Sequence, residues 1–239
     1  MANEQPTDGP AAAASWRELA VARSLDPARA RAEARVQRFL DAALGLMRDT
    51  GGRDFTLQQV VERSGQSLRS FYQHFEGKHE LLLALFEESV RATADHLRTV
   101  VAEESDPLAR VHRFAVEYHR ICRPAGAAGT PGDLPVPVMA DFAQQLLTSH
   151  PKEAARAFVP LVELFDEVLD TAAAAGEVRP DLPQAGVTGL LLQAIMFNAF
   201  AATISGSPGR VDTGEAAESL WDLFLHGLGA RGAGLKARP

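Results

Sequence analysis

The chain has a single cysteine and no apolar run at its N-terminus. The lone Cys122 excludes a disulfide within the chain and fits a reducing compartment. We interpret it as a core residue rather than a redox centre, because free cysteines are usually buried and inert. The first fifteen residues, MANEQPTDGPAAAAS, have neither a basic segment nor a long apolar stretch. We therefore expect no signal peptide, no membrane span and a cytoplasmic protein.

The chain also lacks a positive net charge, since its formal charge is -7 at pH 7. This total argues against a protein that coats nucleic acid indiscriminately. The charges are unevenly spread, however. Residues 17–78 carry eleven basic and eight acidic side chains, whereas residues 79–239 carry thirteen basic and twenty-one acidic ones. A basic front on an acidic body favours contact with a polyanion through the front alone.

Strand-like alternation of polar and apolar residues is absent as well, so we predict an all-α fold. Apolar residues recur instead at three- and four-residue steps, between loops rich in glycine and proline. The hydrophobic share of 46% is ample for a sizeable core. Helices are predicted over residues 27–49, 57–64, 68–75, 78 to about 105, 107–123, 136–149, 151–175, 183–204 and 213–228, and Pro160 is predicted to delay or kink its helix.

Residues 57–75 predict two short helices joined by a turn. Thr56 and Gln59 form a capping box at the start of the first helix. Gly65 permits the turn, and Ser67 is predicted to cap the second helix. This arrangement is the helix-turn-helix plan, in which the second helix enters the major groove of DNA.

The second helix of this pair has two chemically different sides. At about 100° per residue, Phe71 and Phe75 share one side, and Arg69 and Gln73 share another. The aromatic pair would anchor the helix and leave the polar pair free. Arginine pairs bidentately with guanine and glutamine with adenine, and a good pair contributes ~1 to 3 kcal/mol of discrimination. We predict a base-reading face, flanked by Tyr72 and His74, with Lys78 on a phosphate.

Residues 55–82, FTLQQVVERSGQSLRSFYQHFEGKHELL, resemble the DNA-binding region of the tetracycline-repressor (TetR) family. That region closes with an FY-x-x-F-x-x-K-x-x-L run, which here is Phe71-Tyr72, Phe75, Lys78 and Leu81. Together with the preceding helix, the likeness covers about residues 30–85. The rest of the chain resembles the family only in the number and length of its helices.

The resemblance implies a homodimeric repressor that binds a palindromic double-stranded DNA operator and releases it when a small molecule enters the helical body. It implies a helix-turn-helix DNA-binding domain over residues 28–78 and an effector-binding and dimerisation domain over 79–230. The composition of the N-terminal residues, rich in alanine and polar residues without periodicity, predicts a mostly disordered leader over 1–27, and we also expect a flexible tail over 231–239. Carried over position by position, the contacts to bases or nearby sugar-phosphate are Gln58, Ser67, Leu68, Arg69, Tyr72 and Gln73, and those to phosphates are Thr56, His74 and Lys78.

Some positions leave alternatives open. Gln66 stands where the family has a small apolar residue, and Leu68 where a polar base-reader is common. Leu68 either covers a thymine methyl or turns inward. The arginines of the first helix, Arg29, Arg31, Arg35 and Arg38, either form a basic arm for the minor groove or a solvated, salt-bridged face.

The last two helices are apolar on nearly all sides, so they must be buried in the core or against a partner. The resemblance implies that they form a four-helix interface between two copies, and a monomeric core is the alternative. The predicted interface residues are Gly189, Ala194, Ala199, Ala202, Leu220 and Phe224.

Apolar faces of the middle helices supply candidates for an effector pocket. Few charges are evident among them, so the expected effector is largely apolar and moderately large. The candidates are Phe114, Tyr118, Phe142, Phe158, Phe165, Gln193, Met196 and Phe197.

Rival functions find weaker support. A carboxylate-bridged di-metal enzyme needs two Glu-x-x-His motifs on facing helices, and only Glu76 to His79 fits, across a helix break. His112 and His119 share a face, but lone helical histidines are usually structural. A helical ligand carrier or protein-interaction adaptor without DNA binding would leave Arg69 and Gln73 unused. We therefore predict neither an enzyme nor a cofactor.

Overall fold

The computed structural model describes residues 16–50, 55–123, 139–178, 184–204 and 213–228. Nine helices make up this part of the chain, and none of its residues forms a β-strand. The predicted all-α fold is confirmed. None of the helices described combines the length and apolarity that crossing a membrane requires.

The first helix, α1 (Trp16–Thr50), begins earlier than predicted. The sequence pattern placed its start at Pro27, after a disordered leader, but Pro27 lies inside the helix. Proline removes one backbone hydrogen bond, yet the residues around it are rich in alanine, arginine, glutamate and leucine, which are strong helix formers. The part of the predicted leader from Trp16 onward is therefore helical, and residues 1–15 lie outside the described chain.

Two short helices, α2 (Leu57–Ser64) and α3 (Leu68–Tyr72), follow with the predicted caps. The Thr56 hydroxyl accepts from the Gln59 amide at 3.2 Å, and the Gln59 side chain accepts from the Thr56 amide at 2.8 Å, which completes the capping box. Gly65 ends α2 in the left-handed conformation at φ 65°. The turn glycine and both caps were predicted from the sequence alone.

The third helix is shorter than predicted, since it ends at Tyr72 rather than Phe75. The amides of His74 and Phe75 both donate to the Phe71 carbonyl at 2.9 Å, so the chain tightens and the helix ends there. This tight turn keeps Phe75 beside Phe71 while redirecting the chain toward the next helix.

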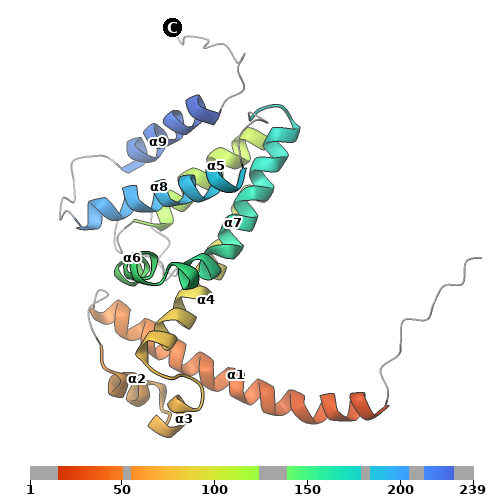
Figure 1. Ribbon diagram of the computed structural model, residues 1–239, viewed down its shortest axis with the longest axis vertical. Coiled ribbons are helices and arrows are strands. Elements are labelled where there is room, and N and C mark those ends of the chain that lie inside the picture. Colours follow the sequence, from red (N-terminus) through yellow and green to blue (C-terminus); the bar gives the residue numbers. More distant parts are fainter. Residues whose placement is uncertain (1–15, 51–54, 124–138, 179–183, 205–212, 229–239) are drawn as a thin grey trace, which may run out of the picture.

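The remaining helices build a larger bundle above this small domain (Figure 1). The long α4 (Lys78–Ala102) rises from α1–α3 and packs against α5 and α7, and α8 packs against both of these helices. We call α1–α3 with the start of α4 the head, and the rest the body. The other body helices are α5 (Pro107–Ile121), α6 (Ala140–Ser149), α7 (Pro151–Ala174), α8 (Gln184–Ile204) and α9 (Thr213–Leu228).

Two proline predictions have different outcomes in the body. Pro107 begins α5 behind the N-cap Asp106, as the loop before it predicted. Pro160 lies inside α7, which begins at Pro151 and runs on to Ala174. The late start predicted as one alternative for α7 is therefore wrong.

Candidate DNA-binding face and effector cavity

The aromatic side of α3 anchors it in the core of the head, as predicted. Phe71 is fully buried, and its ring centroid lies 5.4 Å from that of Phe39 on α1 and 5.2 Å from that of Phe75. Phe39 also meets Phe75 at 6.2 Å. Three interlocked rings therefore fix the rotation of α3 about its own axis, and this rotation decides which side chains point outward.

The opposite flank of α3 is exposed. Arg69 and Gln73 face solvent, and Tyr72 has 57% of its surface exposed. Leu68 is 49% exposed, so the alternative in which it turns inward is excluded. One arginine, one glutamine and two apolar groups on a single outward surface suit contacts to base edges and to thymine methyl groups.

The other base and sugar-phosphate candidates lie around this flank. Gln58 is exposed on α2 and hydrogen-bonds to Glu62 at 3.3 Å. The Thr56 and Ser67 hydroxyls are exposed but serve as helix caps, because each accepts a hydrogen bond from a backbone amide. Both caps sit at helix N-termini, where backbone amides favour a phosphate.

Two of the side chains predicted to contact phosphates, those of Lys78 and His74, lie against other parts of the protein. The Lys78 ammonium donates to the Phe55 carbonyl at 2.7 Å and lies 4.4 Å from the centroid of the Phe55 ring. His74 is half-buried, and its Nε2 atom is enclosed without a hydrogen-bond partner. In this structure Lys78 fastens the start of α4 to the segment before α2, a role that the sequence pattern did not indicate.

The four arginines of the first helix all lie within α1. Arg29 is exposed and pairs with Glu33 at 2.7 Å, and Arg38 donates to the Ala34 carbonyl at 3.2 Å. These contacts fit the solvated, salt-bridged face. Because this segment is helical, the four arginines do not form an extended arm here.

The body contains a cavity of about 610 Å³ between α7 and α8, with walls also from α5 and α6. Glu163 is the one charged side chain among the described residues that line it. Volumes of roughly 300 to 1,000 Å³ and mostly apolar walls are typical of small-molecule sites. The lining residues are Tyr118, Leu147, Pro151, Ala154, Ala155, Phe158, Val159, Val162, Glu163, Gly189, Leu192, Gln193 and Met196.

The predicted pocket residues divide into three groups. Tyr118, Phe158, Gln193 and Met196 line the cavity. Phe114, Phe142 and Phe165 are buried outside its lining, and the rings of Phe114 and Phe165 lie 4.5 Å apart in the core. Phe197 is 45% exposed and does not line the cavity.

Small residues along α7 were missed by the sequence reasoning. Ala154, Ala155 and Val159 form part of the wall, yet an alanine or valine on a helical stripe has no feature that separates a cavity wall from plain core. Gly189, predicted for the interface between copies, also lines the cavity.

Tyr118 lines the cavity, and Cys122 is buried beside it, outside the cavity lining. Burial raises the pKa of the Tyr118 phenol well above its ordinary value, and burial raises the pKa of the Cys122 thiol to about 12. A hydrogen bond joins the two side chains. The predicted core position of Cys122 is confirmed, and its high pKa makes it a poor nucleophile.

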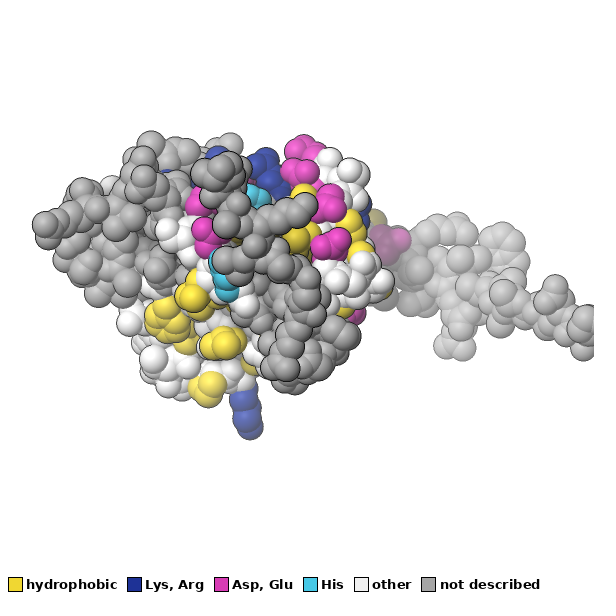
Figure 2. Space-filling view, turned by 90° about the horizontal axis from the view of Figure 1, so that it is seen from above, with side chains coloured by type: hydrophobic (Ala, Val, Ile, Leu, Met, Phe, Trp, Pro, Cys, Tyr) yellow, Lys and Arg dark blue, Asp and Glu magenta, His cyan; other side chains and the backbone are white. Residues whose placement is uncertain are grey.

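The predicted interface residues lie on α8 and α9. Gly189, Ala194 and Phe224 are partly exposed, whereas the side chains of Ala199, Ala202 and Leu220 lie outside the described part. Three large apolar side chains nearby face solvent: Leu190 at 67%, Phe197 at 45% and Leu223 at 68%. Seen from the body end of the molecule, several hydrophobic side chains lie near one another at the lower left of the described surface, and others lie among acidic side chains at the upper right (Figure 2).

The two histidines considered for a metal lie in different surroundings. His112 bonds to Glu218 on α9 at 3.0 Å and its ring lies 4.9 Å from Trp221, while His119 is buried. His112 therefore joins α5 to α9, which is a structural contact.

Solved structures share this fold. The regulator FadR from Bacillus subtilis, in complex with stearoyl-CoA, is 14% identical with a TM-score of 0.62, covering 80% of this chain and 98% of its own. The fatty acid degradation regulator FadR from Bacillus halodurans is 16% identical with a TM-score of 0.62, and the match covers 85% of this chain and 97% of that protein. A TetR/AcrR-family regulator from Thermobifida fusca is 20% identical with a TM-score of 0.58, and the match covers 81% of this chain and 98% of that protein.

No curated protein matches this chain in sequence. Residues 39–85 match the family model described as bacterial regulatory proteins, tetR family. This segment begins at Phe39, which anchors α3, and contains the whole exposed flank of that helix. The relatives are transcriptional regulators and not enzymes. Residues 39–85 are therefore a DNA-binding region of the tetracycline-repressor type, and this match together with the shared fold supports a transcriptional regulator of that family.

Proposed function

We propose that this regulator is a homodimeric repressor that binds a palindromic operator through α3 and leaves it when a largely apolar small molecule fills the body cavity. The observation that carries the proposal is the exposed flank of Arg69, Tyr72 and Gln73 on a helix held by three buried rings. Family members bind DNA and small molecules, and these surfaces are suited to both.

A dimer is proposed from the apolar surface of α8 and α9. Leu190, Phe197 and Leu223 each expose a large apolar side chain there, and association with a second copy would remove this area from water. Two copies would present two α3 helices to half-sites about one helical turn apart, which requires a palindromic operator. Sedimentation of the wild type as a dimer, and of Leu190→Glu as a monomer, would support this part. A monomeric wild type would overturn it.

An apolar effector is proposed from the cavity wall. Glu163 is the one charged lining residue described, and FadR from Bacillus subtilis, which has the same fold, was solved with stearoyl-CoA. A long-chain acyl group is therefore a reasonable first class of probe. We expect stearoyl-CoA or a free fatty acid to release the protein from its operator.

The test begins with selection of genomic fragments, including the region upstream of the protein's own gene, followed by binding measurements on a selected operator. Arg69→Ala should lower specific affinity by ~1 to 3 kcal/mol and relax the base preference. Arg98→Ala, an exposed arginine near the far end of α4, is the matched control and should leave both unchanged. An unaltered operator profile for Arg69→Ala would remove Arg69 from base reading, and absence of any selective binding would favour a carrier or adaptor.

A further inference from the structure

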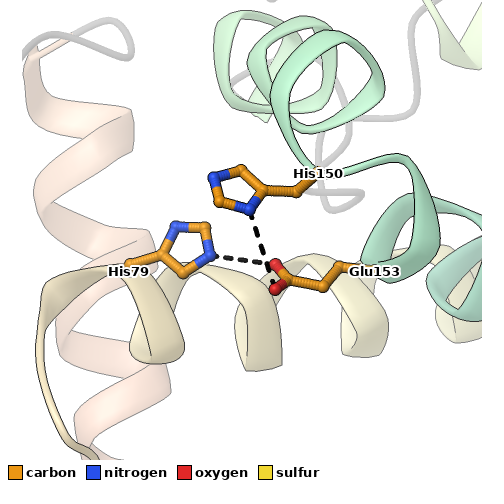
Figure 3. A group of neighbouring side chains, drawn as sticks. All are labelled: His79, His150 and Glu153. Atoms are coloured by element: carbon orange, nitrogen blue, oxygen red, sulfur yellow. Dashed lines mark hydrogen bonds and ion pairs between the residues drawn. The ribbon is translucent and has the colours of Figure 1, made fainter.

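Three side chains that commonly bind metals meet where the head joins the body. His79 lies in the first turn of α4, His150 lies between α6 and α7, and Glu153 lies in the first turn of α7. Figure 3 shows both imidazole rings directed at the Glu153 carboxylate. One ligand atom from each residue lies within 4.8 Å of the other two. Residues more than 70 positions apart in sequence therefore converge on one point.

The separations fit a shared cation. His79 Nε2 lies 3.0 Å from Glu153 Oε2, and His150 Nδ1 lies 3.7 Å from Glu153 Oε1. Two ligands on a tetrahedral ion with bonds of about 2.1 Å lie roughly 3.4 Å apart. The observed distances bracket this value, so small side-chain rotations would suffice to bind an ion.

The surroundings orient the donors and leave one side open. The His79 ring lies 4.7 Å from the His150 ring and 5.9 Å from Phe142, which limits its rotation. All three side chains keep between 38% and 46% of their surface exposed. Solvent therefore has access to a fourth coordination position.

We propose that His79, His150 and Glu153 form a binding site for a divalent transition-metal ion of the zinc type, which clamps the start of α4 to the α6–α7 turn. Two imidazoles with one carboxylate suit zinc and its neighbours in the first transition series. Magnesium and calcium prefer oxygen ligands alone, so they fit this set poorly.

The site borders the effector cavity. Leu147, Pro151 and Ala154, on either side of His150, line the cavity wall. On the other side, His79 follows Lys78, whose amine is bonded to the segment before α2. A bound ion would thus join the cavity wall to the head, and it should change operator affinity. This consequence rests on the proposed function, whereas the metal site itself does not.

Metal binding is tested first, on tag-free full-length protein stripped with a chelator. Isothermal titration with zinc chloride should give one ion per chain, and zinc at a hundredfold over its Kd should raise Tm by roughly 5 to 10 °C. His150→Ala and Glu153→Gln should each weaken binding at least about tenfold, since even outer-shell changes weaken metal sites by about this factor.

His112→Ala is the matched control, because His112 also bonds to a glutamate at 3.0 Å and, among the residues that the structure describes, has no third metal-binding side chain beside it. It should bind zinc as the wild type does. Circular dichroism checks that each variant keeps its helices. Absence of stoichiometric binding in the wild type, or equal weakening by His112→Ala, would show that the cluster is an ion-pair network only and would overturn the proposal.

Operator affinity with and without zinc is tested second. The wild type should change its affinity about fivefold or more, and His150→Ala should not respond. Zinc binding with unchanged operator affinity would overturn the clamp but keep the metal site. Failure of the wild type to bind any operator would instead refute the proposed function, and the titration result would stand.

Discussion

In the head, the side chains that matter for recognition are near neighbours in sequence, whereas in the body they come from distant helices. Arg69 and Tyr72 lie on α3, and Gln73 is its C-cap residue, so all three fall within five positions of the chain. The cavity instead takes its walls from four helices, and two of them, α7 and α8, contribute small residues such as Ala154 and Gly189. Neighbouring residues in the sequence can therefore specify a recognition surface, whereas the shape of a cavity depends on the distances between whole helices.

The largest expected effect tests whether the packed rings of Phe39, Phe71 and Phe75 stabilise the head. Phe71→Ala should lower the free energy of unfolding by about 3 to 5 kcal/mol, because it empties a fully buried site between Phe39 and Phe75. Urea unfolding measures the loss, and operator binding should disappear with it. Tyr72→Ala, on the exposed flank of the same helix, is the control and should lose less than about 1 kcal/mol. Similar losses for both variants would mean that the rings do not anchor α3.

A second prediction concerns the body, which is held partly by a buried carboxylate. Burial raises the pKa of Glu117, but hydrogen bonds from Arg120 and His96 outweigh it and hold the net pKa below its ordinary value. Glu117→Gln should therefore lower the free energy of unfolding at pH 7 by about 1 to 3 kcal/mol.

The pH dependence follows from the direction of this shift. A carboxyl with a lowered pKa stabilises the fold above its unfolded pKa of about 4.3, and this contribution is lost as the pH falls through the folded value. The difference between wild type and Glu117→Gln should be full at pH 7 and shrink below about pH 4. Urea unfolding at both pH values checks this, and a constant difference would contradict the assignment.

A third prediction separates the two readings of Gly189, which lines the cavity and was predicted for the interface between copies. A Cβ atom built there meets no atom within 4 Å, so a leucine at position 189 begins in open space and would extend into the cavity that Gly189 lines. We expect stearoyl-CoA to bind at least about tenfold more weakly, a change of about 1.4 kcal/mol, with dimerisation retained. Dissociation of the dimer with unchanged ligand binding would assign Gly189 to the interface instead.

The smallest expected effect tests how much a single capping residue stabilises the head. Thr56→Ala removes the capping box of α2 and should lower stability by about 1 kcal/mol in thermal unfolding. Thr99→Ala removes a hydroxyl that bonds to the Asp95 carbonyl within α4 and caps nothing, so it should have little effect. Equal effects would show that the cap contributes no more than an ordinary surface hydroxyl.

Most helix positions followed from the sequence, and the exceptions have physical reasons. The pattern placed α2 and α9 at their observed bounds, since glycine, proline and capping residues act on their immediate neighbours. It misplaced the start of α1 because a proline that suits the first turn of a helix also lies inside this one. It extended α3 through Phe75, where a tight turn replaces the helix.

The sequence by itself determined the two sides of α3, because a regular helix fixes which residues share a face and burial of Phe71 and Phe75 fixes which face is outside. Only the tertiary structure decided that Phe114 and Phe165 pack in the core while Phe158 lines a cavity. The same holds for Lys78, whose amine meets Phe55, and for His79, which meets His150 and Glu153. These outcomes depend on distances between helices that are far apart in the chain, and no local spacing of residues encodes such distances.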